Sequence, residues 1–262
     1  MKKTGSNKRV VVIPVFNEEQ KIIDILSACE GQMDIFVIIN DGSADRSGEI
    51  INSWKQGKDN VYLICSQKNR GMSWAVKEGF RFIHHNRDKL GISDDDIIIQ
   101  VDADAQHSVH NINELIDYME RNQIEYLVTR RTLKGYPLIK IIGNRLMSIF
   151  ASILTFRRFY DIECGYRLVK VKVIQRLLFY TVGFKYSWAQ EMAVICARLG
   201  FKIDNRWETE TNYYRRRGTR FIDALINCLF SSLVLHINFC LKKLSNIRCP
   251  DGKNYAINEG VE

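Results

Sequence analysis

The sequence predicts an α/β fold built on an open, mainly parallel β-sheet, and three observations support this. Short apolar runs rich in Val and Ile recur through the first half of the chain, helical patterns alternate with them, and polar side chains follow strand after strand. Strands covered on both faces are nearly continuous in apolar residues, and their alternation with helices is typical of parallel sheets. In such sheets, ligands bind beyond the carboxyl ends of the strands.

The predicted elements follow in order along the chain. The strands are residues 10–14, 35–39, 61–65, 97–99 and 126–128. Helical patterns occupy residues 18–29, 46–54, 73–83 and 112–119. In each pattern the apolar residues fall on one side of the helix, so that side can cover the sheet.

A polar residue follows each of the first two strands and allows two interpretations, and a glycine follows the third strand. Asn17 is either the N-cap of the next helix or a residue of a ligand pocket. Asp41 precedes Gly42, and this pair is either a simple turn or a hydrogen-bond acceptor for a base or ribose. Gly71 opens the third helix, where closely approaching backbone amides suit an anion.

The segment after the fourth strand, Val-Asp-Ala-Asp-Ala-Gln-His at residues 101–107, is the most informative in the chain. Asp102 and Asp104 are two apart on an extended segment, so both carboxylates can bind one hard cation that also binds phosphates. For an isolated pair of this kind, a solvated strand end is the alternative. The polar residues after the other strands favour the metal site.

Five segments in this order carry a family resemblance: P-V-F-N-E, N-D-G-S-A-D, N-R-G-M-S-W-A-V-K-E-G-F, D-A-D-A-Q-H and D-I-E-C-G-Y-R-L. Together they resemble a family 2 glycosyltransferase of the branch that includes dolichyl- and polyprenyl-phosphate mannosyl- and glucosyltransferases. The resemblance covers about residues 9 to 220. It implies a GT-A (Rossmann-like) nucleotide-sugar-binding domain, a divalent cation and inversion at the anomeric carbon.

The resemblance also implies roles for individual residues. The nucleotide pocket would be lined by Pro14, Asn17, Glu18 and Asp41. Mg²⁺ or Mn²⁺ and the diphosphate would be held by Asp102, Asp104 and Gln106, with Asp104 counted among the catalytic residues. One departure concerns the base: the branch usually has two acids before Gly-Ser, and this chain has Asn40-Asp41. Asn both donates and accepts hydrogen bonds, so the preference for a base is left open.

The acceptor side of the family uses arginines, and three in this chain match. Arg131 and Arg145 would bind an acceptor phosphate, for which a planar guanidinium is well suited. Arg215 lies three residues before Gly218, as in the family, although Arg220 stands where a Ser is expected. An ordinary basic surface is the alternative for these arginines.

The acceptor decides whether a base is needed. A phosphate monoester is already ionised near neutral pH and can attack without a strong base, so positioning and electrostatics dominate. A sugar hydroxyl would need a carboxylate base, and Asp161 and Glu191 are the candidates. Glu191 begins a predicted helix that runs to Leu199, so a stabilising acid in the first turn is its alternative role.

Composition agrees with a single catalytic domain. The chain has 262 residues, 46% of them hydrophobic, and no linker rich in Pro, Gly or Ser. Its seven cysteines include no C-x-x-C pair, and the basic N-terminus leads straight into the first strand, so we expect a reducing, cytoplasmic setting without a secretion signal. The net charge is +8. Basic residues lie beside long apolar segments and are not interleaved with stacking aromatics, so nucleic acid is not an expected partner.

Two long segments read as amphipathic helices. Residues 221–245 and 138–156 each have a polar stripe and a broad apolar face flanked by Arg and Lys. Each helix either packs on the domain or lies peripherally in the headgroup region of a membrane, and polar residues argue against a spanning helix for residues 221–245. We therefore predict a GT-A domain at residues 1–220 and a C-terminal amphipathic helix with a polar tail at residues 221–262.

The sequence favours a metal-dependent, inverting transferase that moves a hexose from GDP-mannose or a UDP-hexose to polyprenyl phosphate. One rival is the same fold acting on a sugar hydroxyl in polysaccharide or glycolipid synthesis. A second rival is a non-catalytic module that binds a nucleotide sugar or lipid. The sequence does not indicate an oligomeric state.

Overall fold

The computed structural model describes residues 7–182, 187–211 and 234–241. A seven-stranded sheet in the order β3-β2-β1-β4-β7-β5-β8 forms its centre. The strands are β1 (Arg9–Val15), β2 (Ile35–Asn40), β3 (Val61–Cys65), β4 (Ile97–Gln100), β5 (Tyr126–Val128), β7 (Arg167–Lys170) and β8 (Ile203–Asp204). A second, two-stranded sheet pairs β6 (Arg130–Arg131) with β9 (Glu208–Thr209).

All five predicted strands are confirmed, and the sheet is parallel from β3 through β4. The sequence analysis missed β7, which runs antiparallel between β4 and β5. Its four residues are all buried although two of them are charged, so the run lacks the continuous apolar signature of the other strands. This antiparallel strand brings the segment before it, residues 161–166, to the edge of the sheet where β4 ends.

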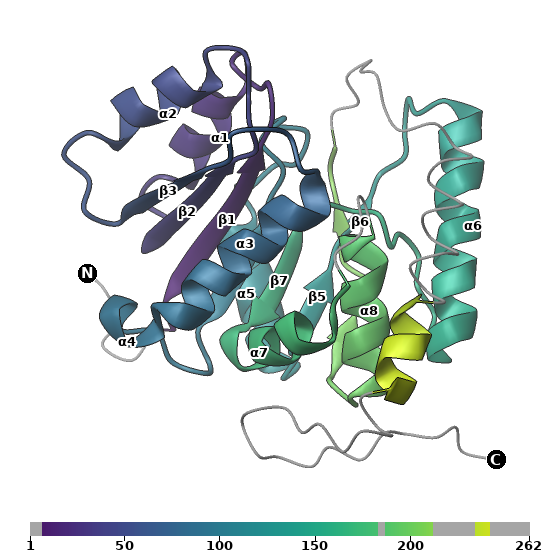
Figure 1. Ribbon diagram of the computed structural model, residues 1–262. Helices are drawn as coiled ribbons and strands as arrows, with labels where there is room; N and C mark the ends of the chain where they lie inside the picture. The colour runs from purple at the N-terminus through teal and green to yellow at the C-terminus, as the bar shows by residue number, and fades with distance from the viewer. Residues whose placement is uncertain (1–6, 183–186, 212–233, 242–262) are drawn as a thin grey trace.

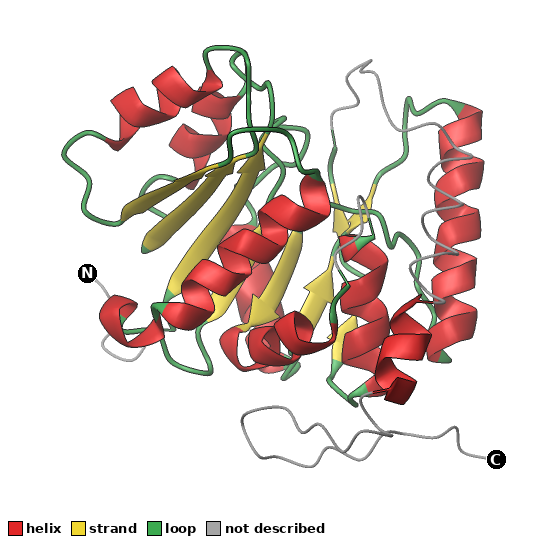
Figure 2. Ribbon diagram, in the orientation of Figure 1, coloured by secondary structure: helices red, strands yellow, loops and turns green. Residues whose placement is uncertain are grey.

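Helices cover the sheet on both sides (Figures 1 and 2). The helices α3 (Met72–His85), α7 (Val171–Tyr180) and α8 (Trp188–Arg198) contact one another on the near side in Figure 1. The remaining helices within the domain are α1 (Ile22–Cys29), α2 (Ser47–Lys55), α4 (Arg87–Leu90) and α5 (Ile112–Arg121). One continuous core joins the sheet to these helices, and it includes fully buried Val and Ile side chains from β1, β2 and β4.

The helix α6 (Leu138–Thr155) stands at the edge of the molecule beyond α8 (Figure 1). Its orientation is the reverse of what an amphipathic helix on a soluble domain normally shows, because its polar stripe faces the protein. Asn144, Ser148 and Thr155 are buried, whereas the aliphatic side chains on the opposite side are exposed. Those exposed side chains are Leu138, Ile139, Ile142, Leu146, Ile149 and Ile153. By length and composition, α6 is also the one helix within the described ranges that is able to cross a membrane.

The second predicted amphipathic helix is described only at residues 234–241, which are helical. Leu235 and Phe239 are buried there, and the Phe239 ring stacks on Tyr180 of α7 with a centroid distance of 4.2 Å. The Asn238 amide donates a hydrogen bond to the Tyr180 carbonyl at 2.7 Å. This part of the segment therefore packs on the domain. The predicted domain boundary at residue 220 lies outside the described residues.

Candidate active site

The loops that leave β1, β2 and β3 are joined by side-chain to backbone hydrogen bonds. The Asn17 side chain accepts a hydrogen bond from the Ala44 amide at 2.8 Å, and the Asn17 amide donates to the Ser43 hydroxyl at 3.0 Å. The Glu18 amide donates to the Ser47 hydroxyl at 2.8 Å. The N-cap interpretation of Asn17 is wrong, because α1 begins at Ile22 and has no side-chain cap. Asn17 and Glu18 instead fasten the first loop to the second.

Asp41 organises the next pair of loops. Its buried carboxylate accepts hydrogen bonds from the backbone amides of Arg70 at 2.9 Å and Gly71 at 2.7 Å. At Gly42, which has φ +70°, an added Cβ would lie 2.5 Å from the Lys68 carbonyl carbon, so only glycine fits this turn. Two hydrogen bonds leave a carboxylate with further acceptor capacity, so Asp41 can hold the loop and still accept a bond from a base or ribose.

Asp102 and Asp104 lie together at the end of β4, as predicted. Burial, and after it the neighbouring Asp104 carboxylate, raise the pKa of Asp102 to about 7, although the charges of Arg167 and Arg131 act in the opposite direction. Asp104 is tied to Gln106, whose side-chain amide donates to it at 2.6 Å and whose backbone amide donates at 3.0 Å. The two neighbouring carboxylates repel each other, and a cation bound between them would offset this repulsion.

The donor set fits a divalent cation shared with a ligand. Within the described ranges, no three His, Cys, Asp or Glu side chains are placed so that they could hold a metal ion by themselves. Mg²⁺ is commonly held by one or two carboxylates plus substrate phosphates and water, which matches two aspartates. His107 lies in the same motif but is buried against the Tyr166 ring, and burial together with the charge of Arg131 lowers its pKa to about 3. It is a neutral core residue.

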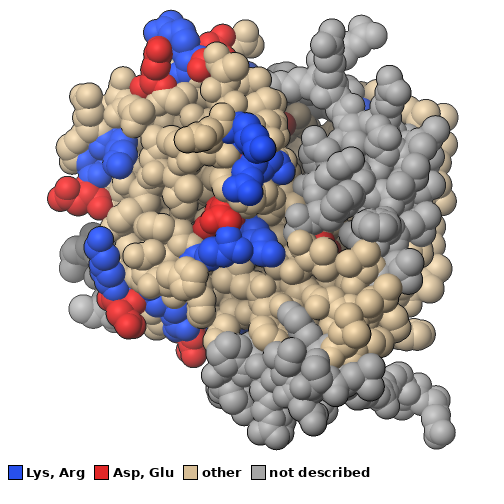
Figure 3. All heavy atoms as spheres, in the orientation of Figure 1, with Lys and Arg blue, Asp and Glu red and all other residues tan. Residues whose placement is uncertain are grey.

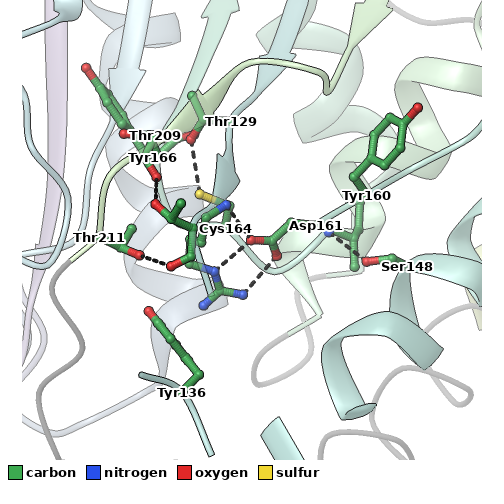
Figure 4. Close-up of polar contacts among 12 residues, drawn as sticks. Thr129, Tyr136, Ser148, Tyr160, Asp161, Cys164, Tyr166, Thr209 and Thr211 are labelled. Atoms are coloured by element: carbon green, nitrogen blue, oxygen red, sulfur yellow. Dashed lines mark hydrogen bonds and ion pairs between the residues drawn. The ribbon is translucent and has the colours of Figure 1, made fainter. Parts of the chain in front are cut away.

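Arg131 and Asp161 form an ion pair, and Figure 4 shows the Asp161 carboxylate with its dashed contacts near the centre. Nε and Nη2 of Arg131 each lie 2.8 Å from a carboxylate oxygen of Asp161, and the Arg131 backbone amide donates to the same carboxylate at 2.9 Å. Burial opposes both charges, but the interaction with Arg131 outweighs it and holds the pKa of Asp161 below its usual value. Asp161 therefore orients Arg131 and leaves its Nη1 unengaged by the carboxylate.

Tyr136 connects this pair to the metal side. Its ring centroid lies 5.8 Å from the Arg131 guanidinium carbon, and its hydroxyl is 3.5 Å from the side-chain oxygen of Gln106. Gln106 in turn contacts Asp104. The structure thus brings four predicted site residues, Asp104, Gln106, Arg131 and Asp161, into one connected cluster in which Tyr136 was not predicted.

The other predicted residues lie elsewhere. Glu191 is buried at the start of α8, where its carboxylate accepts hydrogen bonds from Thr181, Ser187 and the Val182 amide at 2.8 Å. Arg145 is exposed on α6 and lines a groove of about 670 Å³. Pro14 lies within β1, one residue before the end of the strand, and β1 leads into the loop that carries Asn17 and Glu18. Arg215 lies outside the described residues.

Sequence reasoning also missed Gly165 and Arg167, although both belong to the quoted motif D-I-E-C-G-Y-R-L. Arg167 is buried and donates to the carbonyls of Cys164 at 2.7 Å and Ile162 at 3.0 Å. Gly165 is also buried, and it lies against the Asp102 carboxylate. No spacing rule signals the contact of Gly165 with Asp102, because it depends on the antiparallel placement of β7 beside β4.

Comparison with known proteins shows similarity to lipid-phosphate sugar transferases. A curated protein of Methanocaldococcus jannaschii, itself uncharacterized, is 31% identical over 74% of this chain and 84% of its own length. The UDP-N-acetylglucosamine–dolichyl-phosphate N-acetylglucosaminyltransferase of Methanococcus voltae is 25% identical over 72% of this chain and 79% of its own length. An undecaprenyl-phosphate 4-deoxy-4-formamido-L-arabinose transferase of Photorhabdus laumondii is 26% identical over 64% of this chain and 50% of its own length.

Solved structures show the same GT-A fold at low sequence identity. Glucosyl-3-phosphoglycerate synthase from Mycobacterium tuberculosis, in complex with Mn²⁺, UDP and phosphoglyceric acid, has a TM-score of 0.62 at 16% identity, over 89% of this chain and 78% of that chain. A mannosyltransferase from Pyrobaculum calidifontis, in complex with GDP-Man and Mn²⁺, has a TM-score of 0.58 at 14% identity, over 95% of this chain and 67% of that chain. The family model described as glycosyl transferase family 2 matches residues 10–178, and this chain is therefore a glycosyltransferase of family 2.

Proposed function

We propose that this glycosyltransferase moves a hexose from a nucleotide sugar to polyprenyl phosphate, with inversion at the anomeric carbon, in a metal-dependent reaction. The observation that carries the proposal is the arginine side of the cluster: Arg131 is oriented by Asp161 and connected through Tyr136 to the aspartate pair. The names of two relatives, which act on dolichyl phosphate and undecaprenyl phosphate, support the same acceptor class.

On the donor side, Asp102 and Asp104 would hold Mg²⁺ or Mn²⁺, with Gln106 positioning Asp104. When bound, this cation neutralises charge on the leaving nucleoside diphosphate. The loops fastened by Asn17, Glu18 and Asp41 would receive the nucleoside, because they lie at the carboxyl edge of the parallel strands. GDP-mannose and UDP-hexoses both fit this description.

On the acceptor side, Arg131 would bind the phosphate through Nη1 while Asp161 holds its other nitrogens. A phosphate oxygen is already a nucleophile at neutral pH, so positioning next to the anomeric carbon supplies most of the rate. Both predicted carboxylate bases accept hydrogen bonds within the protein, Asp161 from Arg131 and Glu191 from residues around it. This favours a phosphate acceptor over a sugar hydroxyl.

The exposed apolar side of α6 supports a peripheral position on a membrane, and the cytoplasmic face is the side we propose. The groove beside it combines guanidinium groups with aliphatic and aromatic walls, and its lining includes Arg145, Arg157, Arg158, Ile149, Phe156 and Tyr160. Phe156 is 90% exposed. A basic helix with one broad apolar side is suited to an anionic membrane surface, where an acceptor with a long apolar chain resides.

The experiment is a donor panel assayed with a short polyprenyl phosphate and Mn²⁺, with Asp104→Asn as the inactive control. We expect one donor to give a lipid-linked sugar that mild acid releases, because the product is a phosphodiester of the anomeric carbon. An acid-resistant glycoside formed on a saccharide acceptor would instead identify the hydroxyl-directed transferase. Mn²⁺-dependent nucleotide binding without turnover on any acceptor would identify a non-catalytic module.

A further inference from the structure

Gly165 lies closer to a predicted metal ligand than any side chain would permit. A Cβ at this position would lie 1.9 Å from Oδ2, 2.4 Å from Cγ and 2.7 Å from Oδ1 of Asp102. Carbon atoms in non-bonded contact lie about 3.5 to 4.0 Å apart. The carboxylate of Asp102 therefore occupies the space that a side chain at residue 165 would fill.

The backbone does not explain the glycine. Gly165 is not among the glycines with positive φ, whereas Gly42 and Gly71 are. An alanine at residue 165 would adopt this backbone conformation without the cost of a left-handed residue. The three heavy atoms nearest to a Cβ at residue 165 all belong to Asp102.

The segment that carries Gly165 has little freedom to move away. Arg167 donates to two carbonyls of this segment, those of Ile162 and Cys164. The Ile162 amide donates to the Ser148 hydroxyl of α6 at 3.1 Å, and the Thr129 hydroxyl donates to the Tyr166 carbonyl at 3.0 Å. Figure 4 shows Ser148 and Thr129 in contact with this segment, of which Cys164 is a part. A side chain at residue 165 would thus displace the carboxylate of Asp102.

We propose that Gly165 is a positioning residue whose missing side chain seats Asp102 in the orientation that binds the divalent cation and diphosphate. The inference rests on the proposed function, in which Asp102 is a metal ligand. It also gives the turn from Asp161 to Arg167 a double role. One end fixes the acceptor-side arginine through Asp161, and four residues later the same turn fixes the donor-side aspartate.

The test uses Gly165→Ala, Asp102→Ala and the double variant. The affinity for Mn²⁺ is measured by electron paramagnetic resonance with saturating UDP and, separately, GDP. We expect Gly165→Ala to weaken Mn²⁺ binding about tenfold to a hundredfold, as loss of support for a metal ligand typically does. In the Asp102→Ala background, Gly165→Ala should change nothing further. Wild-type affinity in Gly165→Ala, or an equal loss in both backgrounds, would overturn the inference.

If Gly165→Ala folds poorly, thermal denaturation of the single and double variants tests the inference instead. If the double variant regains stability, the contact with Asp102 is the cause and the inference stands; if it does not, the inference is wrong. A metal-free crystal structure of Gly165→Ala separates this inference from the proposed function. We expect Asp102 displaced and the turn in place, and a shifted turn with Asp102 in its original orientation would contradict the inference whatever the enzyme binds. If the wild-type protein binds Mn²⁺ with neither UDP nor GDP, the proposed function is wrong. A displaced Asp102 in the Gly165→Ala crystal structure would still support the role of Gly165.

Discussion

The ionised carboxylate of Asp102 would favour cation binding but lowers the stability of the metal-free fold. Burial and Asp104 raise its pKa to about 7 in the folded protein, above the ordinary value of 3.8. The folded state therefore keeps a proton that the unfolded state releases, and the metal-free protein loses stability as pH rises through this interval. Asp102→Asn removes the ionised form. We expect the metal-free variant to be more stable than wild type by about 1 to 2 kcal/mol at pH 8, a value discounted for partial exposure, and similar to it near pH 4.

Denaturation with chelator at both pH values checks this expectation, and Mn²⁺ titration of the same samples should show lost affinity. A variant less stable than wild type at pH 8 would mean that the carboxylate is stabilising and that its pKa is not raised. In wild type, affinity for Mn²⁺ should fall as pH is lowered through 7, because protons compete for Asp102.

Asp161 is the second residue whose role can be separated by measurement. Asp161→Asn leaves the Arg131 guanidinium buried with a neutral partner, and breaking a buried pair costs about 3 to 5 kcal/mol. We expect a higher KM for polyprenyl phosphate, unchanged Mn²⁺-dependent nucleotide binding and a pH–rate profile of unchanged shape. Arg131→Lys keeps the charge without the planar fork and should raise the same KM. A fall in kcat with loss of the acidic limb of the profile, at constant acceptor KM, would make Asp161 a general base.

At the scale of elements, the sequence indicated the parallel half of the fold well and the antiparallel half poorly. The strands from β1 to β4 are continuous apolar runs because both of their faces are buried, so their pattern was readable. The charged residues of β7 hid that strand, and with it the approach of Gly165 to Asp102. Asp102, Asp104 and Gln106 were predictable because they are neighbours in sequence. The Arg131–Asp161 pair joins residues 30 positions apart, and no local pattern specifies such a contact.

The helix α6 shows the limit of reading amphipathicity from sequence. The pattern defined a polar and an apolar side, but it did not reveal which side faces the protein. The buried polar side is used: Ser148 accepts from the Ile162 amide, and Ser152 accepts from the Phe159 amide at 2.8 Å. Packing against a polar turn has thus left the apolar side outward.

This orientation predicts that α6 supplies membrane affinity. Replacing Ile149 and Ile153, which are 55% and 64% exposed, by Ser should reduce binding to anionic vesicles about tenfold or more, because each removes apolar surface from the bilayer contact. Stability should change little. Ile23→Ser is the control, since Ile23 is 41% exposed on α1, which lies on the opposite side of the molecule from α6 in Figure 1. Sedimentation with vesicles at low and high salt measures the effect. Equal loss in the control, or none in the α6 variant, would contradict this role.

At the scale of the whole molecule, the distribution of charge bears on what the protein can bind. On the side drawn in Figure 3, the Lys and Arg side chains of the described residues form separate groups, with Asp and Glu beside several of them. The described residues on this side form no single basic patch, so the net charge of +8 attracts the protein to anionic surfaces in general. The groove that contains Arg145, Arg157 and Arg158 concentrates basic groups beside apolar ones, and that combination suits a lipid phosphate.

The C-terminal segment decides whether residues 1–220 are a complete domain. The described helix at residues 234–241 contributes Leu235 and Phe239 to the core, and Arg198 of α8 approaches His236 at 2.9 Å. Phe239→Ala removes a buried ring stacked on Tyr180 and should lower the free energy of unfolding by about 3 to 5 kcal/mol. Leu241→Ala, at a position that is 58% exposed, should change it by about 0.5 kcal/mol or less. Urea denaturation of both variants, with vesicle binding measured on the folded proteins, separates the two roles of the segment. If Phe239→Ala keeps its stability but loses its vesicle affinity, the helix belongs to the membrane contact and the domain ends before it.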